Sequence, residues 1–250
     1  MLKVESRLKH RMTDSCELKR VRSHLFGGLV LVSGLVLLLF DTTGHADEFE
    51  AVSLFDGKTL ENWDGDPRFW QVENNAITGT TTADKALSRS TYLIWRGKAF
   101  DDFKMTFEYR IIGGNSGVHF RSREVSKWQA EGYQADISDW EDYTGVFYAS
   151  HRAQLAFRGE SVAIDEDGTK NVTKFGDHDD LRKHIKEKEW NRYTAIAKGS
   201  HIMLLVNGVM MSQGFDRDRE HATRKGIIAI QLHDGPPMKI QIRNIILQQL

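Results

Sequence analysis

The feature that most constrains the fold is a series of short segments in which apolar and polar residues alternate. The segments end at Gly, Asn or Asp, and such alternation is typical of strands with one buried face. Roughly a dozen of these strands, joined by hairpins, predict an all-β domain built as a two-sheet antiparallel jelly-roll sandwich. The clearest segments read FWQVENNAITG, FKMTFEYRI, VHFRS, YQADI, GVFYAS, QLAFRG, YTAIAK, HIMLLV, IIAIQL and KIQIRNIIL.

Two other patterns refine this prediction. Asn207-Gly208, between HIMLLV and VMMS, predicts a hairpin, because both central positions of such a turn favour positive φ. Only residues 178–189 read as helical, and they are charged almost all round, which indicates a surface helix or an ordered loop. The acidic DEDG at residues 165–168 lacks the spacing of a calcium loop and predicts a plain hairpin turn.

The first 46 residues have the features of an export signal. A basic, polar stretch over residues 1–24 precedes an apolar run over residues 25–40, and small residues follow at Gly44 and Ala46. We expect a secretory signal cleaved after Ala46, followed by one exported domain, residues 47–250, in the periplasm or outside the cell. The alternative is an uncleaved anchor, although the run is shorter than the roughly 20 apolar residues of a spanning helix. Contact with a membrane would then involve this segment alone.

Composition excludes several functions for residues 47–250. They hold 27 basic and 31 acidic residues without a basic stripe, so we expect no nucleic-acid partner. The only cysteine, Cys16, lies in the first 46 residues, so the domain has no disulfide and no thiol nucleophile. No GxSxG elbow, phosphate loop or HExxH helix is present, and no organic cofactor is expected.

Several predicted strands place polar groups opposite their apolar face. The segment GGNSGVHFRSR, residues 113–123, joins a turn to a strand whose alternation puts His119, Arg121 and Arg123 on one face. An imidazole and two guanidiniums exceed what solubility requires. We expect the polar faces to line one groove suited to carbohydrate, and nearby aromatic rings suit stacking on sugars. The aromatic residues are Trp128, Tyr133, Trp140 and Tyr143.

A set of motifs also resembles a known family. FDGKTLENW, DDFKMTFEYRI, NSGVHFRS, GYQADI, TGVFY, EWNRYTAIAKG, LVNG and GIIAIQLHDGPPMKIQIRNI follow one another along residues 52–250. Together they resemble the 3-keto-disaccharide hydrolase domain family. The resemblance implies a concanavalin A-like sandwich of the laminin-G or glucanase type, and action on sugars whose C3 hydroxyl is oxidised to a ketone. Many relatives read GYE-x-Q-I where this chain has Gln134 and Asp136, which indicates a subgroup with a different substrate or altered chemistry.

A C3 ketone makes a particular cleavage accessible. It acidifies the C2 hydrogen and leaves the C1 glycosidic oxygen β to the resulting carbanion, so proton abstraction, elimination and addition of water can follow. This route needs a base near neutral pKa, a positive group or metal beside the enolate, and an acid for the leaving oxygen. His119 is the leading base or metal ligand, and Asp136 and Glu108 are candidates for base, acid or ligand. A divalent metal such as calcium is compatible with this set.

The other candidates bind substrate. Arg121 and Arg152 would clamp the enolate or a substrate oxygen, and the remaining residues would orient hydroxyls or stack on the sugar. Structural alternatives stay open: His119 bonding across the sheet, Glu108 in an ion pair with Arg110 or Arg121, and Arg152 holding a loop. The remaining residues are Asn115, Gln134, Tyr148, Gln231, His233 and Trp128.

Three functions are compatible with these patterns. The first is an exported enzyme that cleaves a 3-keto-glycoside by hydrolysis or elimination. The second is a non-catalytic carbohydrate-binding module on the same scaffold, because fold does not dictate function. The third is a structural or adhesion domain tethered through an uncleaved N-terminus. A binding module should tolerate the loss of His119 and Asp136, whereas an enzyme should not.

Overall fold

The computed structural model describes residues 51–140 and 142–250. The predicted signal or anchor, residues 1–46, lies outside the described residues and stays a prediction. Within the described part of the chain, no helix is both long enough and apolar enough to cross a membrane.

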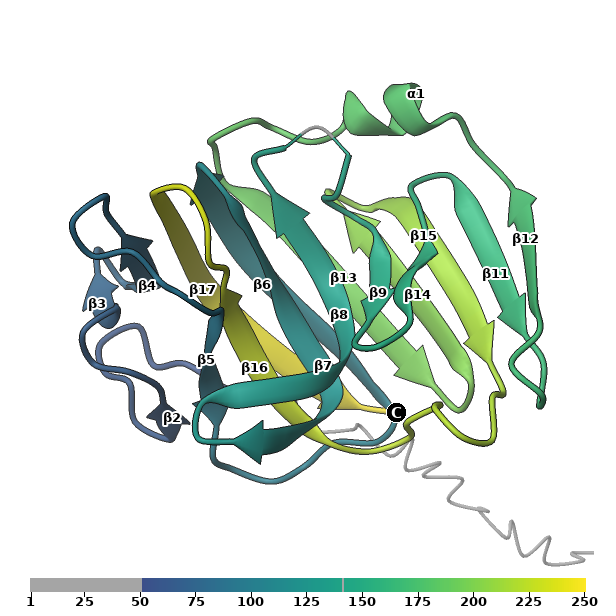
Figure 1. The fold of residues 1–250 in the computed structure, drawn as a ribbon, viewed down its shortest axis with the longest axis horizontal. Coiled ribbons are helices and arrows are strands. Elements are labelled where there is room, and N and C mark those ends of the chain that lie inside the picture. The colour runs from purple at the N-terminus through teal and green to yellow at the C-terminus, as the bar shows by residue number, and fades with distance from the viewer. Residues whose placement is uncertain (1–50, 141) are drawn as a thin grey trace, which may run out of the picture. The chain divides into compact units, whose positions relative to one another are not determined.

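Two β-sheets pack face to face, which confirms the all-β class (Figure 1). The smaller sheet has seven strands. Their order across the sheet is β10 (Ala153–Ala156), β9 (Phe147–Ala149), β8 (Gln129–Ser138), β7 (Asn115–Ser126), β16 (Ile227–Leu232), β5 (Thr91–Trp95) and β2 (Trp63–Asp64).

The larger sheet has ten strands. Nine follow the order β12 (Lys170–Lys174), β11 (Glu160–Ile164), β15 (Val209–Asp216), β14 (His201–Val206), β13 (Asn191–Lys198), β6 (Phe103–Ile112), β17 (Met238–Gln249), β4 (Ala76–Thr81) and β3 (Trp70–Glu73). The tenth, β1 (Ala51–Ser53), pairs with β17. The sheet is not wholly antiparallel as predicted, because β11 runs parallel to β15.

The hydrophobic core lies between the two sheets. In β6 every second side chain is buried, from Phe103 to Ile111, as the alternation predicts. The seven-stranded sheet contributes Val118, Phe120 and Ile230 to the same cluster. Because side chains alternate along a strand, their neighbours in β7, β8 and β16 lie on the outer face of that sheet.

Local turns follow their sequence signals. Asn207 and Gly208 have φ of 51° and 83° and join β14 to β15. The acidic turn joins β11 to β12, which pair as an antiparallel hairpin. The helix α1 (His178–Arg182) covers only the start of the predicted helical segment; the side chain of Asp177 caps it by accepting from two backbone N–H groups.

The predicted common face for His119, Arg121 and Arg123 is wrong. The pairing of β7 with β8 shifts register between Phe120 and Arg123, and Arg121 has φ of 47°. Such a bulge turns the following side chains away from the alternating pattern. The guanidinium of Arg121 is buried and donates to the carbonyls of Asp101 and Gly199 and to Asp102.

Candidate functional site

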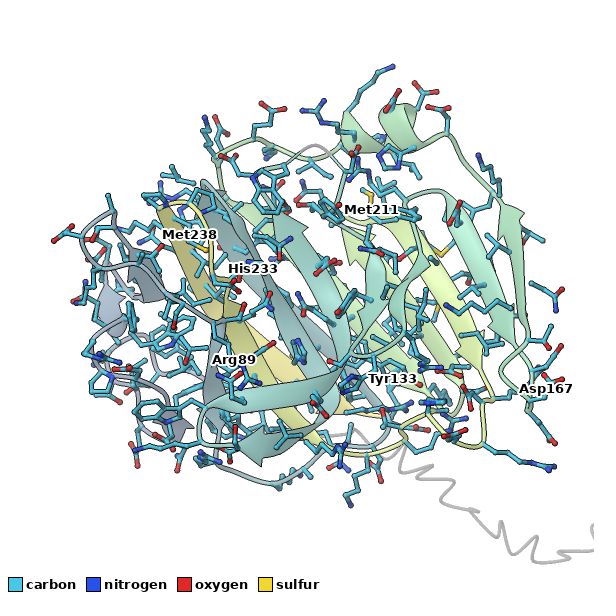
Figure 2. All side chains as sticks on the ribbon, viewed as in Figure 1. Arg89, Tyr133, Asp167, Met211, His233 and Met238 are labelled. Carbon is cyan, nitrogen blue, oxygen red and sulfur yellow. The ribbon has the colours of Figure 1, made fainter. Side chains whose placement is uncertain are left out.

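A polar cavity of about 260 Å³ opens on the outer face of the seven-stranded sheet. Figure 2 shows the side chains around it, with His233 just beyond the end of β16. Six predicted substrate-binding or catalytic residues line it: Asn115, Gln134, Asp136, Tyr148, Gln231 and His233. Ser150, Gln154, Tyr92, Trp140 and Tyr143 complete the lining.

Strand register explains why these residues meet. Gly117 of β7 lies opposite Asp136 of β8 and opposite Gln231 of β16. On the next pair of strands, Gln134 lies opposite Tyr148 of β9. All four side chains therefore project from one face of adjacent strands, with the glycine at the centre.

Gly117 makes room for the side chain of Gln134. A Cβ at position 117 would lie 2.3 Å from Nε2 of Gln134. That nitrogen donates to Oδ1 of Asp136 at 2.6 Å, and it lies 3.1 Å from both Oε1 of Gln231 and the carbonyl of Ser116. The amide of Gln134 thus lies over Gly117 and holds the carboxyl of Asp136 in place.

His119 does not line the cavity but hydrogen-bonds to the amide of Gln134. Its side chain is buried, and its Nε2 lies 2.5 Å from Oε1 of Gln134, while its Nδ1 lies 3.3 Å from Oγ of Ser122. Burial lowers the pKa of His119 to about 4, against the opposing effect of the Gln134 hydrogen bond. The imidazole is therefore neutral at neutral pH. Because an amide oxygen only accepts, Nε2 carries the hydrogen, an assignment that rests on the hydrogen-bond network.

Asp136 is the carboxyl that faces the cavity. It is 5% exposed, and burial raises its pKa well above the usual range, although the hydrogen bond from Gln134 works in the opposite direction. Burial, with a smaller effect of the charge on Asp136, also raises the pKa of Tyr148. Burial thus favours the protonated form of both groups.

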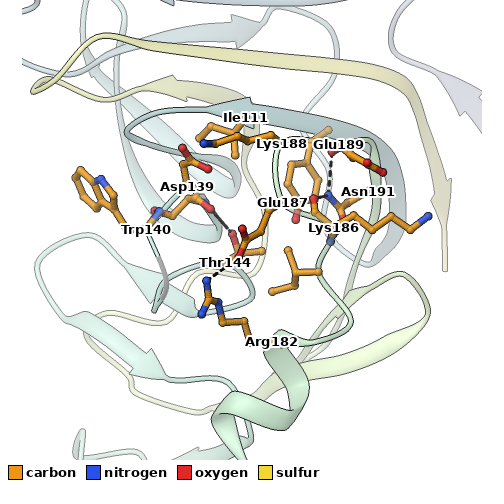
Figure 3. A pocket seen from close by; sticks show the side chains of 13 residues that line it. Ile111, Asp139, Trp140, Thr144, Arg182, Lys186, Glu187, Lys188, Glu189 and Asn191 are labelled. Carbon is orange, nitrogen blue, oxygen red and sulfur yellow. Dashed lines mark hydrogen bonds and ion pairs between the residues drawn. The ribbon is translucent and has the colours of Figure 1, made fainter.

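Aromatic rings form one rim of the cavity. Trp140 is 43% exposed, and its ring lies 6.2 Å from that of Tyr143 and 6.3 Å from that of His233. Behind Trp140 lies a smaller cavity of about 30 Å³, bounded on its far side by residues 185–189 and Asn191 (Figure 3). Its volume is that of about one water molecule, so the larger cavity is the candidate sugar site.

Four predicted site residues lie away from the cavity: Arg121, Arg152, Glu108 and Trp128. The guanidinium of Arg152 forms ion pairs with Asp216 and Asp218. Glu108 is on the outer face of the ten-stranded sheet, 2.8 Å from Nε of Arg243 and 4.0 Å from Arg192. It forms a cross-strand ion pair, with partners other than those expected. Trp128 donates from Nε1 to Asp64, and Lys127 lies over its ring.

The three candidate metal ligands do not come together. Glu108 belongs to the opposite sheet, and the imidazole nitrogens of His119 face Gln134 and Ser122. Across residues 51–140 and 142–250, no three His, Cys, Asp or Glu side chains are grouped so that they could hold a metal ion. His119, Asp136 and Glu108 therefore do not form a site for a divalent metal, and no step below is derived through one.

Sequence reasoning missed Tyr92, Ser150 and Gln154. Tyr92 stands in TYLIW, where an unbroken apolar run conceals which side chains face outward. Its hydroxyl accepts from Nε2 of Gln231 at 3.2 Å, which adds it to the polar row. The alternation within QLAFRG could have indicated Gln154, because it places Gln154 on the face opposite Leu155. Leu155 is indeed buried in the core.

Comparison with solved structures identifies related sandwiches. A candidate glycosyl hydrolase from Parabacteroides distasonis ATCC 8503 is 18% identical with a TM-score of 0.56, and the match covers 80% of this chain and 100% of that one. A carbohydrate-binding module from Bacillus subtilis is 13% identical with a TM-score of 0.50, over 75% and 96% of the two chains. A Bacillus subtilis protein with a galectin-like fold is 10% identical with a TM-score of 0.51, over 76% and 90%. These identities show the fold alone.

No curated protein matches the chain in sequence. The model of the 3-keto-alpha-glucoside-1,2-lyase-like domain matches residues 50–248, which confirms the resemblance drawn from the motifs. Since that match spans nearly all of the sandwich and well over half of the sequence, the chain belongs to the family of 3-keto-alpha-glucoside-1,2-lyase-like domains.

Proposed function

We propose that this protein cleaves the glycosidic bond of 3-keto-α-glucosides by elimination, in the cavity around Asp136. The observation that carries the proposal is the buried carboxyl of Asp136, whose pKa is raised and whose position is fixed by Gln134. Membership of the family supports the substrate class. The polar lining and aromatic rim support a sugar as ligand.

The carboxyl of Asp136 would move the proton. In its ionised form it takes the hydrogen from C2, and the electron pair of that bond shifts to the C3 oxygen as an enolate. The enolate then collapses, the C1–C2 double bond forms, and the C1–O bond breaks. Asp136 returns the proton to the leaving oxygen, so the products are a 1,2-unsaturated 3-ketosugar and the free aglycone. A carboxyl with a raised pKa is a stronger base than an ordinary one and suits both steps.

Other cavity residues have supporting roles. Tyr148 keeps its proton because its pKa is raised, and its hydroxyl would donate to the developing enolate oxygen. Asn115, Gln231 and His233 would bind the ring hydroxyls. Gln134 and His119 do not touch the reacting atoms in this proposal; they position the carboxyl.

An aryl 3-keto-α-glucoside tests the reaction directly. We expect release of the phenol from the keto form and not from the unoxidised glucoside, slower release when C2 carries deuterium, and an enone in the product by NMR. The Asp136→Asn variant should lack this activity. Turnover of the unoxidised glucoside alone, or of both forms at the same rate, would contradict the proposed route.

A second candidate function is non-catalytic carbohydrate binding. It is favoured by the aromatic rim of the cavity and by the similar fold of a carbohydrate-binding module. In that case the keto-glucoside would bind without turnover, and Asp136→Asn would bind it about as well as the wild type.

A further inference from the structure

Tyr92 ends a row of residues that crosses four strands of the seven-stranded sheet. Tyr92 of β5 lies opposite Gln231 of β16, and Gln231 lies opposite Gly117 of β7. Gly117 in turn lies opposite Asp136 of β8. Both end residues of the row line the cavity, and the amide of Gln134 occupies the place of the missing side chain of Gly117. A ligand above this amide therefore lies between Tyr92 and Asp136.

A backbone carbonyl fixes the direction of the hydrogen bonds in this row. The carbonyl oxygen of Ser116 can only accept, and it lies 3.1 Å from the amide atom of Gln134 that also bonds to Asp136. That atom is therefore the nitrogen, an assignment that rests on the hydrogen-bond network. The same nitrogen lies 3.1 Å from the amide of Gln231, so the oxygen of Gln231 faces it. The nitrogen of Gln231 is thereby left to face Tyr92.

The hydroxyl of Tyr92 keeps its own hydrogen for a ligand. It accepts from Nε2 of Gln231 at 3.2 Å, and it makes no second hydrogen bond among the residues that the structure describes. If Tyr92 instead donated to Gln231, the reversed amide would set its N–H groups against those of Gln134. Tyr92 is 8% exposed, and it lines the cavity. Its hydroxyl is thus a donor without an acceptor at the cavity wall.

The surroundings of Tyr92 hold both its ring and its proton. The ring packs edge-on against the imidazole of His119, with centroids 4.9 Å apart and an interplanar angle of 78°. Burial raises the pKa of Tyr92 to about 12, against the effect of the Gln231 hydrogen bond, and the charges of Tyr148 and Asp136 act in the same direction as burial. The hydroxyl therefore stays protonated at neutral pH. A neutral donor held in place before the reaction is suited to an oxygen on which negative charge develops.

We infer that Tyr92 is a further catalytic residue, a hydrogen-bond donor to the oxygen on C3 of the sugar. The inference rests on the proposed function and deepens it, because it assigns a residue to the atom that receives the charge. When Asp136 takes the hydrogen from C2, the electron pair moves to the C3 oxygen, and Tyr92 stabilises that charge without transferring its proton. Tyr92 and Tyr148 come from β5 and β9, which flank the three strands beneath the cavity, so they approach the oxygen from two sides.

Tyr92→Phe tests this role, because it removes the hydroxyl and keeps the ring against His119. The matched control is Tyr193→Phe, at a buried tyrosine outside the cavity whose hydroxyl has no hydrogen bond among the described residues. With an aryl 3-keto-α-glucoside, kcat of Tyr92→Phe should fall about 10²-fold, as for one lost oxyanion donor. KM should rise only about fivefold, as for one hydrogen bond in the ground state.

Tyr193→Phe should keep the kcat and KM of the wild type. Wild-type kcat in Tyr92→Phe, or an equal loss in both variants, would overturn the inference. The proposed function would then stand, because the wild type still releases the phenol.

A binding measurement decides the inference even where the proposed function fails. Methyl α-glucoside and its 3-deoxy analogue differ only in the C3 oxygen, and neither has the ketone that elimination requires. Calorimetric titration should show a preference for the glucoside that is about fivefold greater in the wild type and Tyr193→Phe than in Tyr92→Phe. The reason is that the C3 oxygen and the Tyr92 hydroxyl form one contact.

This greater preference supports Tyr92 as the contact of the C3 oxygen even if the wild type turns over no keto-glycoside. The same preference in all three proteins would overturn the inference. Absence of binding of either sugar to a wild type that also lacks turnover would overturn it as well.

Discussion

Nε2 of Gln134 lies 2.6 Å from Oδ1 of Asp136, two residues further along the same face of β8. The oxygen of the same amide lies 2.5 Å from Nε2 of His119. One amide therefore links a neutral imidazole to a buried carboxyl. Changes at His119 should act on the chemistry through Gln134, and changes at Asp136 should act on it directly.

Replacing Asp136 with Asn should abolish elimination while leaving the fold intact. A general acid–base group contributes about 10²–10⁴-fold in rate, so kcat should fall by that factor. The amide removes an ionisable group whose charged form burial disfavours, so the free energy of unfolding at pH 7 should not decrease. Steady-state rates and urea denaturation measure both effects, with the exposed Asp84→Asn as control. Wild-type rates in Asp136→Asn would exclude the assigned role.

Stability should depend on pH through His119. Its pKa is about 4 in the folded protein and 6.5 when unperturbed, so between these values the unfolded chain binds the extra proton. The stabilisation is complete above pH 6.5 and is lost as the pH falls toward 4. The difference between the pKa values corresponds to about 3 kcal/mol.

Urea denaturation of the wild type and His119→Gln across this range checks the effect. The variant retains an N–H donor and does not titrate there. Between pH 6.5 and pH 4, the wild type should lose about 3 kcal/mol more free energy of unfolding than the variant. Parallel stability curves would show that the imidazole is not neutral in the folded state.

Replacing Gly117 with Ala should displace the Gln134 amide. The new Cβ would lie 2.3 Å from Nε2 and 2.6 Å from Cγ of Gln134, so that side chain must move and release its partners. Overpacking of this kind costs about 1–3 kcal/mol. We expect a comparable loss in the free energy of unfolding together with a fall in kcat.

A double-mutant cycle with Gln134→Ala isolates the cause. The side chain of Gln134 is the neighbour that the new methyl group meets, so the double variant should be more stable than the sum of the single effects predicts. Additive losses would place the strain of Gly117→Ala elsewhere in the sheet.

Trp140 should contribute to sugar binding rather than to stability. Its ring is 43% exposed at the cavity rim, and aromatic contacts are worth about 0.5–1.5 kcal/mol beyond burial. Trp140→Ala should raise KM about fivefold and change the free energy of unfolding by less than about 1 kcal/mol. Phe175→Ala, at a similarly exposed residue outside the cavity, is the matched control and should leave KM unchanged. The same KM in both variants would show that Trp140 does not contribute to sugar binding.

Alternation predicted much of the fold, because a sandwich strand exposes one face and buries the other. The burial pattern of β6 follows its sequence residue by residue. Gln134 and Asp136 share one face of β8 as the alternation predicts, although both are buried. The alternation does not reveal which strands pair in the ten-stranded sheet. Glu108 has the same local pattern as Asp136, and only the strand order places it on the opposite sheet.

Other parts of the site depended on backbone details that side-chain patterning does not reveal. A single bulge with positive φ at Arg121 moved that guanidinium away from His119. Gly117 is needed because the side chain of Gln134, from the neighbouring strand, lies against it. The sequence around Gly117 does not distinguish this glycine from one that serves a turn. The resemblance carried by the motifs indicated the family, but not that Arg121 and Arg152 would lie away from the cavity around Asp136.

The position of β17 has a consequence for biosynthesis. Residues 238–249 fill the gap between β6 and β4 and also pair with β1, so three strands made much earlier depend on the last of the described strands. Until those residues leave the ribosome, the nascent chain holds apolar strands with unsatisfied edges, a state open to pairing with other chains. Assembly of the larger sheet therefore cannot be completed before β17 is available for pairing.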